Sequence, residues 1–272
     1  MKYADLHIHS CYSDGTMTPE QIISLAKEKN VKFISITDHD TIASQYVTKG
    51  TWDDIGIIAG IELSAEFQEQ EIHMLGYNLD IENEKLKEVV NKLNKCRINR
   101  MEEILFKLNK HGIYLELDDL DINLNATVGR SHIANAMVSK GYFDNYKSAF
   151  TSYLMKGKPA YVKGFKLGYK DAIDLIHTAG GVPVLAHPGQ VYRGMGIEKV
   201  IKDLKCYGLK GIEVYHPSHT KEQTNYFYNL STKYKLGITG GSDYHGKKSP
   251  GESGIGSCGI NELLLNKIIN IK

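Results

Sequence analysis

Histidine and carboxylate residues recur in short motifs along this 272-residue sequence. The first motif, Asp5-Leu6-His7-Ile8-His9, places two imidazoles two residues apart, and Ser13-Asp14-Gly15 follows it closely. Residues two apart in an extended strand project from the same face, so His7 and His9 can bind one metal ion together. Neutral imidazole combined with carboxylate is a ligand set that suits zinc, manganese or iron.

Six further motifs contain the same residue types. They are Thr37-Asp38-His39-Asp40, Gly60-Ile61-Glu62-Leu63-Ser64, Ile72-His73-Met74, Ala186-His187-Pro188-Gly189, Tyr215-His216-Pro217 and Gly240-Gly241-Ser242-Asp243-Tyr244-His245. A single histidine beside a strand is more often a hydrogen-bonded structural residue than a ligand. Seven such motifs together favour one shared site, and a carboxylate among them can bridge two ions about 3.5–4 Å apart. The pattern predicts a multinuclear metal centre.

The motifs lie at or beside apolar, β-branched runs that are typical of strands. These runs are residues 3–8, 33–37, 57–63, 72–77, 182–186, 211–215 and 236–240. Helix patterns lie between them at 21–30, 171–179 and 198–207, the first with Thr18 as its expected N-cap and Pro19 as its first residue. This alternation predicts an α/β fold with a mostly parallel sheet, closed or nearly closed into a barrel. The strand ends of such a barrel converge on one face, where distant residues can meet.

The alternation stops between about residues 81 and 166. Apolar residues follow helical spacing there, first at Leu86, Val89, Val90 and Leu93, and then at Ile98, Met101, Ile104, Leu105 and Leu108. We expect residues 1–80 and 167–272 to form the barrel domain. We expect residues 81–166 to form a helical cap subdomain over the C-terminal ends of the strands.

The composition limits the partners that the chain can attract. Thirty-three basic and 32 acidic residues leave a formal charge of +1, so we expect no stable nucleic-acid complex and no membrane partner. The four cysteines (Cys11, Cys96, Cys206 and Cys258) are scattered, which predicts reduced thiols without disulfides. No apolar run approaches ~20 residues, and the first motif begins close to Met1, so we expect a cytoplasmic protein.

From Asp5 to about Gly256 the series of motifs resembles the polymerase and histidinol phosphatase (PHP) family. It is most similar to the branch of nucleotide phosphatases and RNase AM, which carries a helical insertion in the same place. The resemblance implies a distorted (β/α)7 TIM-like barrel and a trinuclear metal centre. By motif position, it implies His7, His9, Glu62 and Asp243 for the first metal, Glu62 as a bridge with His73 and His187 for the second, and Asp14, His39 and His245 for the third. Asp14 stands where other branches have histidine, and a carboxylate is an equally competent ligand.

Two further residues are singled out by the resemblance. Arg130, in Thr127-Val128-Gly129-Arg130-Ser131-His132-Ile133-Ala134, is similar to the arginine of a Gly-Arg-Pro-His-Ile-Ala motif that reaches the substrate phosphate, with Ser131 in place of proline. The planar guanidinium suits bidentate phosphate contact, and a helix-capping or surface arginine is the alternative. The resemblance places His216 near the phosphate as a hydrogen-bond donor or proton shuttle, and a structural histidine is the alternative.

The resemblance implies a phosphoric ester hydrolase, with a phosphatase as the expected type, that uses two or three divalent ions of manganese, zinc or iron. Hydroxide bridging the metals would attack phosphorus, with Glu62, Asp243 and His216 as the catalytic residues. The expected substrates are phosphomonoesters of nucleotides (5′-AMP, 3′,5′-bisphosphates), another small phosphomonoester, or the 5′ ends of short RNA. The alternatives are a histidinol phosphatase, against which the long insertion argues, and a non-catalytic metal-binding module, in which ligands should be missing.

Overall fold

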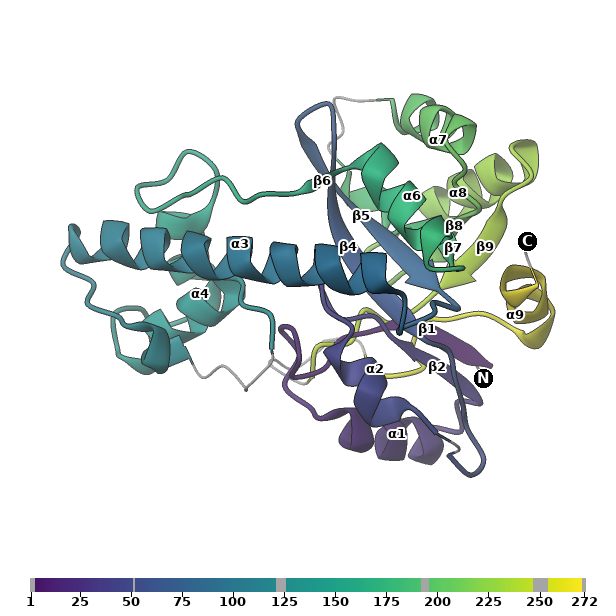
Figure 1. Ribbon diagram of the computed structural model, residues 1–272, viewed down its shortest axis with the longest axis horizontal. Coiled ribbons are helices and arrows are strands. Elements are labelled where there is room, and N and C mark those ends of the chain that lie inside the picture. Colours follow the sequence, from purple (N-terminus) through teal and green to yellow (C-terminus); the bar gives the residue numbers. More distant parts are fainter. Residues whose placement is uncertain (1–2, 51, 121–125, 192–195, 247–253, 271–272) are drawn as a thin grey trace.

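The computed structural model describes residues 3–50, 52–120, 126–191, 196–246 and 254–270 and shows an α/β structure (Figure 1). The strands are β1 (Ala4–Ile8), β2 (Phe33–Ile36), β3 (Gly56–Ile57), β4 (Gly60–Phe67), β5 (Gln70–Tyr77), β6 (Leu167–Gly168), β7 (Val182–Leu185), β8 (Gly211–Tyr215) and β9 (Gly237–Gly240). The helices are α1 (Pro19–Glu28), α2 (Ala43–Thr48), α3 (Glu84–Asn109), α4 (Arg130–Ser139), α5 (Tyr146–Ala149), α6 (Tyr169–Thr178), α7 (Ile197–Cys206), α8 (Lys221–Lys233) and α9 (Glu262–Ile269). Short 3-10 turns cover Leu117–Leu120 and Pro188–Gln190, and a π-helical turn covers Phe150–Leu154.

The strands form two sheets, ordered β1-β2-β3 and β6-β4-β5-β7-β8-β9. All neighbours are parallel except that β5 runs antiparallel to both β4 and β7. The α/β class is therefore confirmed. The reversal of β5 follows from a two-residue hairpin, because Gln68 and Glu69 both adopt positive φ (47° and 65°), as in type I′ turns.

The single strand predicted at 57–63 is wrong, because the chain changes sheets within it. Ile57 ends β3 beside β2, whereas Gly60 begins β4 in the other sheet. A Cβ atom on Gly60 would lie only 2.2 Å from Ser35 Oγ, so the crossing over β2 leaves no room for a side chain. The strand then continues to Phe67, which places Glu62 in its interior.

Two isolated parallel bridges connect the edges of the sheets. Ile8 at the end of β1 pairs with Tyr244, which follows β9, and His39 after β2 pairs with Glu62 of β4. Both bridges lie where the predicted ligands occur. The gap between the two sheets is therefore crossed by the same segments that carry the metal-binding motifs.

Helix α1 begins as the sequence predicts. Thr18 is its N-cap in a capping box with Gln21, and Pro19 is its first residue. The helix buries Ile22 and Ile23 against the sheet formed by β1 and β2. This packing supports the strand that carries the first histidine motif.

Helix α3 is one continuous 26-residue helix that contributes to two cores. Its first half buries Leu86 and Leu93 in the core around β4 and β5, whereas Met101 and Leu108 of its second half pack with Met137 of α4 in a separate core. Figure 1 shows α3 running out from the sheets to the outlying α4. The two predicted helical runs join because no glycine or proline separates them. No helix in the described part of the chain is long and apolar enough to cross a membrane.

Candidate metal centre

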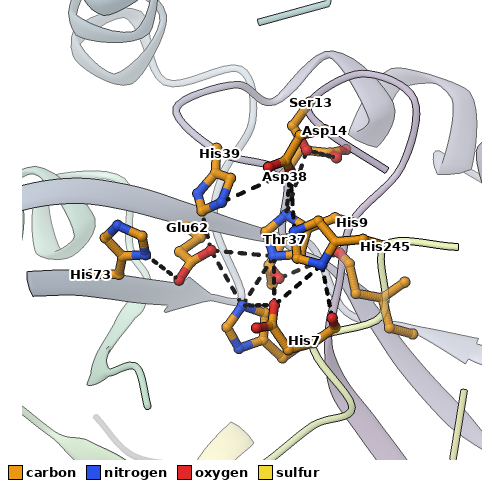
Figure 2. A network of polar contacts seen from close by, with 12 residues as sticks. His7, His9, Ser13, Asp14, Thr37, Asp38, His39, Glu62, His73 and His245 are labelled. Atoms are coloured by element: carbon orange, nitrogen blue, oxygen red, sulfur yellow. Dashed lines mark hydrogen bonds and ion pairs between the residues drawn. The ribbon is translucent and has the colours of Figure 1, made fainter. Parts of the chain in front are cut away.

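The structure brings all nine residues predicted as ligands into one connected cluster. Figure 2 shows seven of them, which are His7 in β1, His9 directly after it, His39 after β2, Glu62 in β4, His73 in β5, and Asp14 and His245. The antiparallel direction of β5 places His73 directly opposite Ser64 of β4, so a residue near the start of β5 reaches the edge where the parallel strands end. His187 follows β7, and Asp243 follows β9.

Glu62 is the centre of this cluster and is fully buried. Its Oε2 atom lies 3.2 Å from His7 Nε2, 3.2 Å from His9 Nε2 and 3.1 Å from His39 Nδ1. Its Oε1 atom lies 2.9 Å from His73 Nδ1 and 3.0 Å from His187 Nε2. One carboxylate therefore faces five imidazoles, as a bridging ligand between metal ions would.

Asp243 and Asp14 extend the cluster on the side of β9. Asp243 Oδ1 lies 3.2 Å from His9 Nε2 and 3.4 Å from His7 Nε2. Asp14 Oδ1 lies 3.1 Å from His245 Nε2 and 3.9 Å from His39 Nε2. The members of each of the three ligand sets implied by motif position therefore lie close together in the cluster.

The donor atoms fit a bound cation better than they fit one another. Glu62 Oε2 and His39 Nδ1 are buried and have no hydrogen-bond partner among the described residues, although they lie 3.1 Å apart. Buried polar atoms without partners are costly, and a cation held by both atoms would satisfy them. Groups of three or four such atoms lie within 4.8 Å of one another, and these groups are His9/Asp14/His39/His245, His7/His9/Asp243, His7/Glu62/His187, His39/Glu62/His73 and His7/Glu213/His216.

The cluster has charge states that suit metal ligands. Burial alone would raise the pKa of Glu62, but the imidazoles around it hold it well below its usual value. The pKa of Asp243 is likewise held well below normal, against its burial, chiefly by His7. Burial also lowers the pKa of His39 to about 3. These three side chains are therefore already in the ionisation state that coordinates a cation.

Metal binding is expected to displace protons from two other imidazoles. Burial would lower the pKa of His9 and of His73, but hydrogen bonds and charges from nearby carboxylates raise each to about 10, so both hold protons at neutral pH. Because a ligand must be deprotonated, manganese binding at pH 7 should release protons, and the apparent affinity should rise with pH up to about 10. Calorimetric titration in two buffers with different ionisation enthalpies measures this release. Binding without proton release would contradict these charge states.

Glu213, a buried carboxylate of β8, was not predicted as part of the site. Its Oε1 atom lies 2.9 Å from His7 Nδ1, and its Oε2 atom accepts a 2.8 Å hydrogen bond from the backbone N–H of His187. Partners of this kind fix the orientation and tautomer of a ligating histidine, here with His7 Nε2 toward Glu62. The available signal was a charged residue inside the apolar run 211–215.

The backbone around the ligands is held in unusual conformations. His187 and Asp243 have positive φ angles of 24° and 51°, which non-glycine residues adopt rarely. The N–H of Asp243 donates to the carbonyl of His7, and a Cβ atom on Gly241 would lie 2.4 Å from the His7 backbone nitrogen. The loop after β9 therefore passes directly against β1, and this contact places Asp243 beside His7 and His9.

His216 lies at the edge of the cluster and is 5% exposed. Its Nδ1 atom accepts from the backbone N–H of Ser218, which leaves the ring proton on Nε2 in the neutral form. That Nε2 atom lies 3.2 Å from Asp243 Oδ2. His219 accepts from the N–H of Gly189 and donates to the carbonyl of Val214, so it supports the loop that carries His187.

A pocket of about 200 Å³ adjoins His39 and His73 and is bordered by four positively charged side chains, Arg97, Arg100, Arg130 and Lys166. We call it the cationic pocket. Of its four cations only Arg130 was predicted, although three of the four arginines in the sequence line it. Arg130 donates to the carbonyl of Leu154, and its guanidinium lies 5.3 Å from the centre of the Phe150 ring.

The positive charge of the cationic pocket is only partly compensated. Arg97 donates to Asp40, and Lys166 forms a 2.7 Å ion pair with Glu71. Burial and the charges of Arg130 and Arg97 lower the pKa of Arg100 to about 10. The nearby carboxylates therefore do not fully neutralise these guanidinium groups. An excess of positive charge of this kind favours the binding of an anion.

Comparisons with known proteins agree with this geometry. A model of the PHP domain family matches residues 5–195. The chain is 33% identical over 247 residues to the 5′-3′ exoribonuclease of Haemophilus influenzae (90% of each chain), and 30% identical over 259 residues to the 3′,5′-nucleoside bisphosphate phosphatase of Chromobacterium violaceum (93% of this chain and 90% of the relative). The structure superposes with a TM-score of 0.87 on a protein from Bifidobacterium adolescentis assigned as a metal-dependent phosphoesterase, at 27% identity, over 98% of this chain and 95% of the other.

Proposed function

We propose that this chain, which belongs to the PHP domain family and is a phosphoester hydrolase, acts on phosphorylated nucleotides. The proposed substrates are nucleoside 3′,5′-bisphosphates and the 5′ ends of short RNA. The observation that carries this proposal is the position of the cationic pocket, which borders His39 and His73 of the ligand cluster. A substrate with one phosphate group at the cluster can thus place a second one beside the arginines.

We propose that His7, His9, Glu62, Asp243, His73, His187, Asp14, His39 and His245 hold two or three divalent ions of manganese, zinc or iron. When bound, such ions neutralise charge on phosphoryl oxygens and supply an activated water molecule. Among these ligands Glu62 would connect the ions, since both of its oxygens face imidazoles. Glu213 would hold the ring of His7 in place through Nδ1.

The remaining polar groups would bind the substrate. Arg130, held against Phe150 and the carbonyl of Leu154, is proposed to bind phosphoryl oxygens with its planar guanidinium. His216 is proposed to donate its Nε2 proton to an oxygen of the substrate, because that proton points to the side of Asp243. A general acid near the cluster would assist departure of the leaving alkoxide.

We also propose that the two sheets represent a distorted (β/α)7 barrel and that residues 81–166 form its cap. The bridges Ile8–Tyr244 and His39–Glu62 support the barrel, since they connect the two sheets. The separate apolar core around Met101 and Met137 supports a cap subdomain. Cap residues such as Arg130 line the same pocket as the proposed ligands.

The proposal is tested by measuring product formation with manganese from adenosine 3′,5′-bisphosphate, a 5′-phosphorylated short RNA, 5′-AMP and histidinol phosphate. Because a charge-assisted contact contributes about 1.5–3 kcal/mol, kcat/KM should be at least about tenfold higher for the first two substrates. An Asp243→Asn protein, purified in the same way, measures contaminating phosphatase activity. A preference for histidinol phosphate would overturn the proposed substrate class.

A further inference from the structure

Arg97 borders the cationic pocket, but its guanidinium is largely engaged within the protein. Its Nε and Nη2 atoms both donate to Asp40 Oδ2, Nη2 also donates to Ser64 Oγ at 3.0 Å, and Nη1 donates to the carbonyl of Val128 at 3.2 Å. A guanidinium has five N–H groups, so these contacts leave one of them. One N–H group is too few for the two parallel bonds with which an arginine holds a phosphate group.

Arg100 and Arg130 differ from Arg97 in this respect. Among the described residues, each of them makes one hydrogen bond, Arg100 to the carbonyl of Val162 and Arg130 to the carbonyl of Leu154. Each guanidinium therefore keeps four N–H groups for a ligand in the pocket. Two arginines of the pocket can bind phosphate as a planar fork, whereas the fork of Arg97 is occupied by a carboxylate of the protein.

Asp40, the partner of Arg97, directly follows the proposed ligand His39 in the chain. It is buried and has a positive φ angle of 52°, which non-glycine residues adopt rarely. Its backbone N–H donates to the carbonyl of Glu62 at 2.9 Å, and its Oδ1 atom accepts a 2.7 Å hydrogen bond from the N–H of Ser64. The turn that carries His39 is therefore bound both to β4 and to Arg97 of α3.

A second contact from the segment before α4 binds the same turn. Thr127 is buried, its Oγ1 atom donates to the carbonyl of His39, and its backbone N–H donates to the carbonyl of Tyr12, both at 2.8 Å. Tyr12 lies two residues before Asp14, another proposed ligand. Contacts from Arg97 and Thr127 therefore converge on the loops that carry two of the three ligands in the set Asp14, His39 and His245.

We propose that Arg97 is a positioning residue for the metal site formed by Asp14, His39 and His245, and that it does not bind the substrate phosphate. This inference rests on the proposed function, because it assumes that these three residues hold a metal ion. Without the guanidinium, Asp40 would be a buried carboxylate that has lost its cation, and the turn beside His39 would rearrange. Loss of a residue that orients a metal ligand typically weakens metal binding about 10- to 100-fold.

The test titrates metal-free protein with manganese and follows the electron paramagnetic resonance signal of the free ion, with thermal unfolding as the check that each variant folds. In Arg97→Gln, at least one ion should bind about 10- to 100-fold more weakly than in the wild-type protein. Arg97→Lys should show the same loss, because an ammonium group keeps the charge of the pocket but cannot form the fork with Asp40. Arg100→Gln, three residues further along α3 and lining the same pocket, is the matched control and should bind manganese as the wild-type protein does.

Two further measurements determine whether Arg97 acts through Asp40. Asp40→Asn should weaken manganese binding to a similar extent, and the double variant should bind no more weakly than either single variant, since each removes the same interaction. The ratio of kcat/KM for adenosine 3′,5′-bisphosphate to kcat/KM for 3′-AMP should keep its wild-type value in Arg97→Gln. A residue that binds the second phosphate would instead lower this ratio.

Unchanged manganese binding in both Arg97 variants would overturn the inference and leave the proposed function standing. A fall in the substrate ratio in Arg97→Gln would also overturn it, because Arg97 would then bind the substrate phosphate. If neither Arg97 variant folds, Asp40→Asn decides, and unchanged manganese binding in that protein overturns the inference. A wild-type protein that binds no manganese would instead contradict the proposed metal centre and the proposed function with it.

Discussion

Replacing Glu62 by glutamine should lower kcat/KM by on the order of 10³-fold or more, which corresponds to about 4 kcal/mol of lost transition-state stabilisation. The two side chains have the same shape, so packing in the buried centre of β4 is retained. Glutamine, however, carries no charge, and its NH2 group would face imidazole nitrogens that now lie 2.9–3.2 Å from a carboxylate. It would also be a poor bridge between cations.

The measurements are steady-state kinetics on the proposed bisphosphate substrate and the metal content of the purified protein. Glu62→Gln should bind at least one ion fewer than the wild-type protein. Glu66→Gln is a matched control, because Glu66 lies four residues further along the same strand, pairs with the exposed Lys163 and does not border the cationic pocket. A Glu62→Gln protein with full metal content and full activity would disprove the proposed bridging role.

Replacing Arg100 by glutamine should weaken hydrolysis of adenosine 3′,5′-bisphosphate by about 10- to 100-fold while affecting 3′-AMP much less. Arg100 lines the cationic pocket, and burial together with the charges of Arg130 and Arg97 lowers its pKa. A second phosphate would neutralise this repulsion, and a charge-assisted contact of about 1.5–3 kcal/mol gives the expected range. The ratio of kcat/KM for the two substrates isolates the effect on the second phosphate.

The same helix offers a matched control for Arg100. Arg100 donates to the carbonyl of Val162 through Nε, and Lys107, two turns further along α3, donates to the carbonyl of Tyr161 at the same distance of 3.0 Å. Both side chains therefore bind the backbone of the segment that contains Tyr161 and Val162, but Lys107 does not line the pocket. Lys107→Gln should leave the ratio unchanged. An equal loss on both substrates in Arg100→Gln would indicate a general structural role.

Local features of this protein could be predicted because short-range physics determines them. The capping box of Thr18 and Gln21 specifies where α1 begins, and helical spacing without glycine or proline specifies the helical stretch from Leu86 to Leu108. The histidine and carboxylate motifs could be recognised because few apolar strands end in such residues. The structure brings those predicted ligands together, and their role in binding metal remains a proposal.

Other residues of the site could not be found from local patterns. Glu213 is a single acidic residue in a short strand, and only the tertiary structure, in which β8 pairs with β7, brings it to His7 and His187. In the sequence, Arg97 and Arg100 cannot be distinguished from solvent-exposed residues of a long helix. They become part of a pocket only because α3 crosses from the core around β4 and β5 to the separate core that contains Met137.

The sequence by itself therefore determined the α/β class, the first helix and the chemical identity of the proposed ligands. The tertiary structure decided the direction of β5, the split of residues 57–63 between two sheets, and the surroundings of the ligand cluster. The physical reason is that helix caps and side-chain periodicity depend on neighbours within a few residues. Strand pairing and pocket charge depend on contacts between residues that are far apart in the chain. Local patterns in a single sequence do not show which of these distant residues come together.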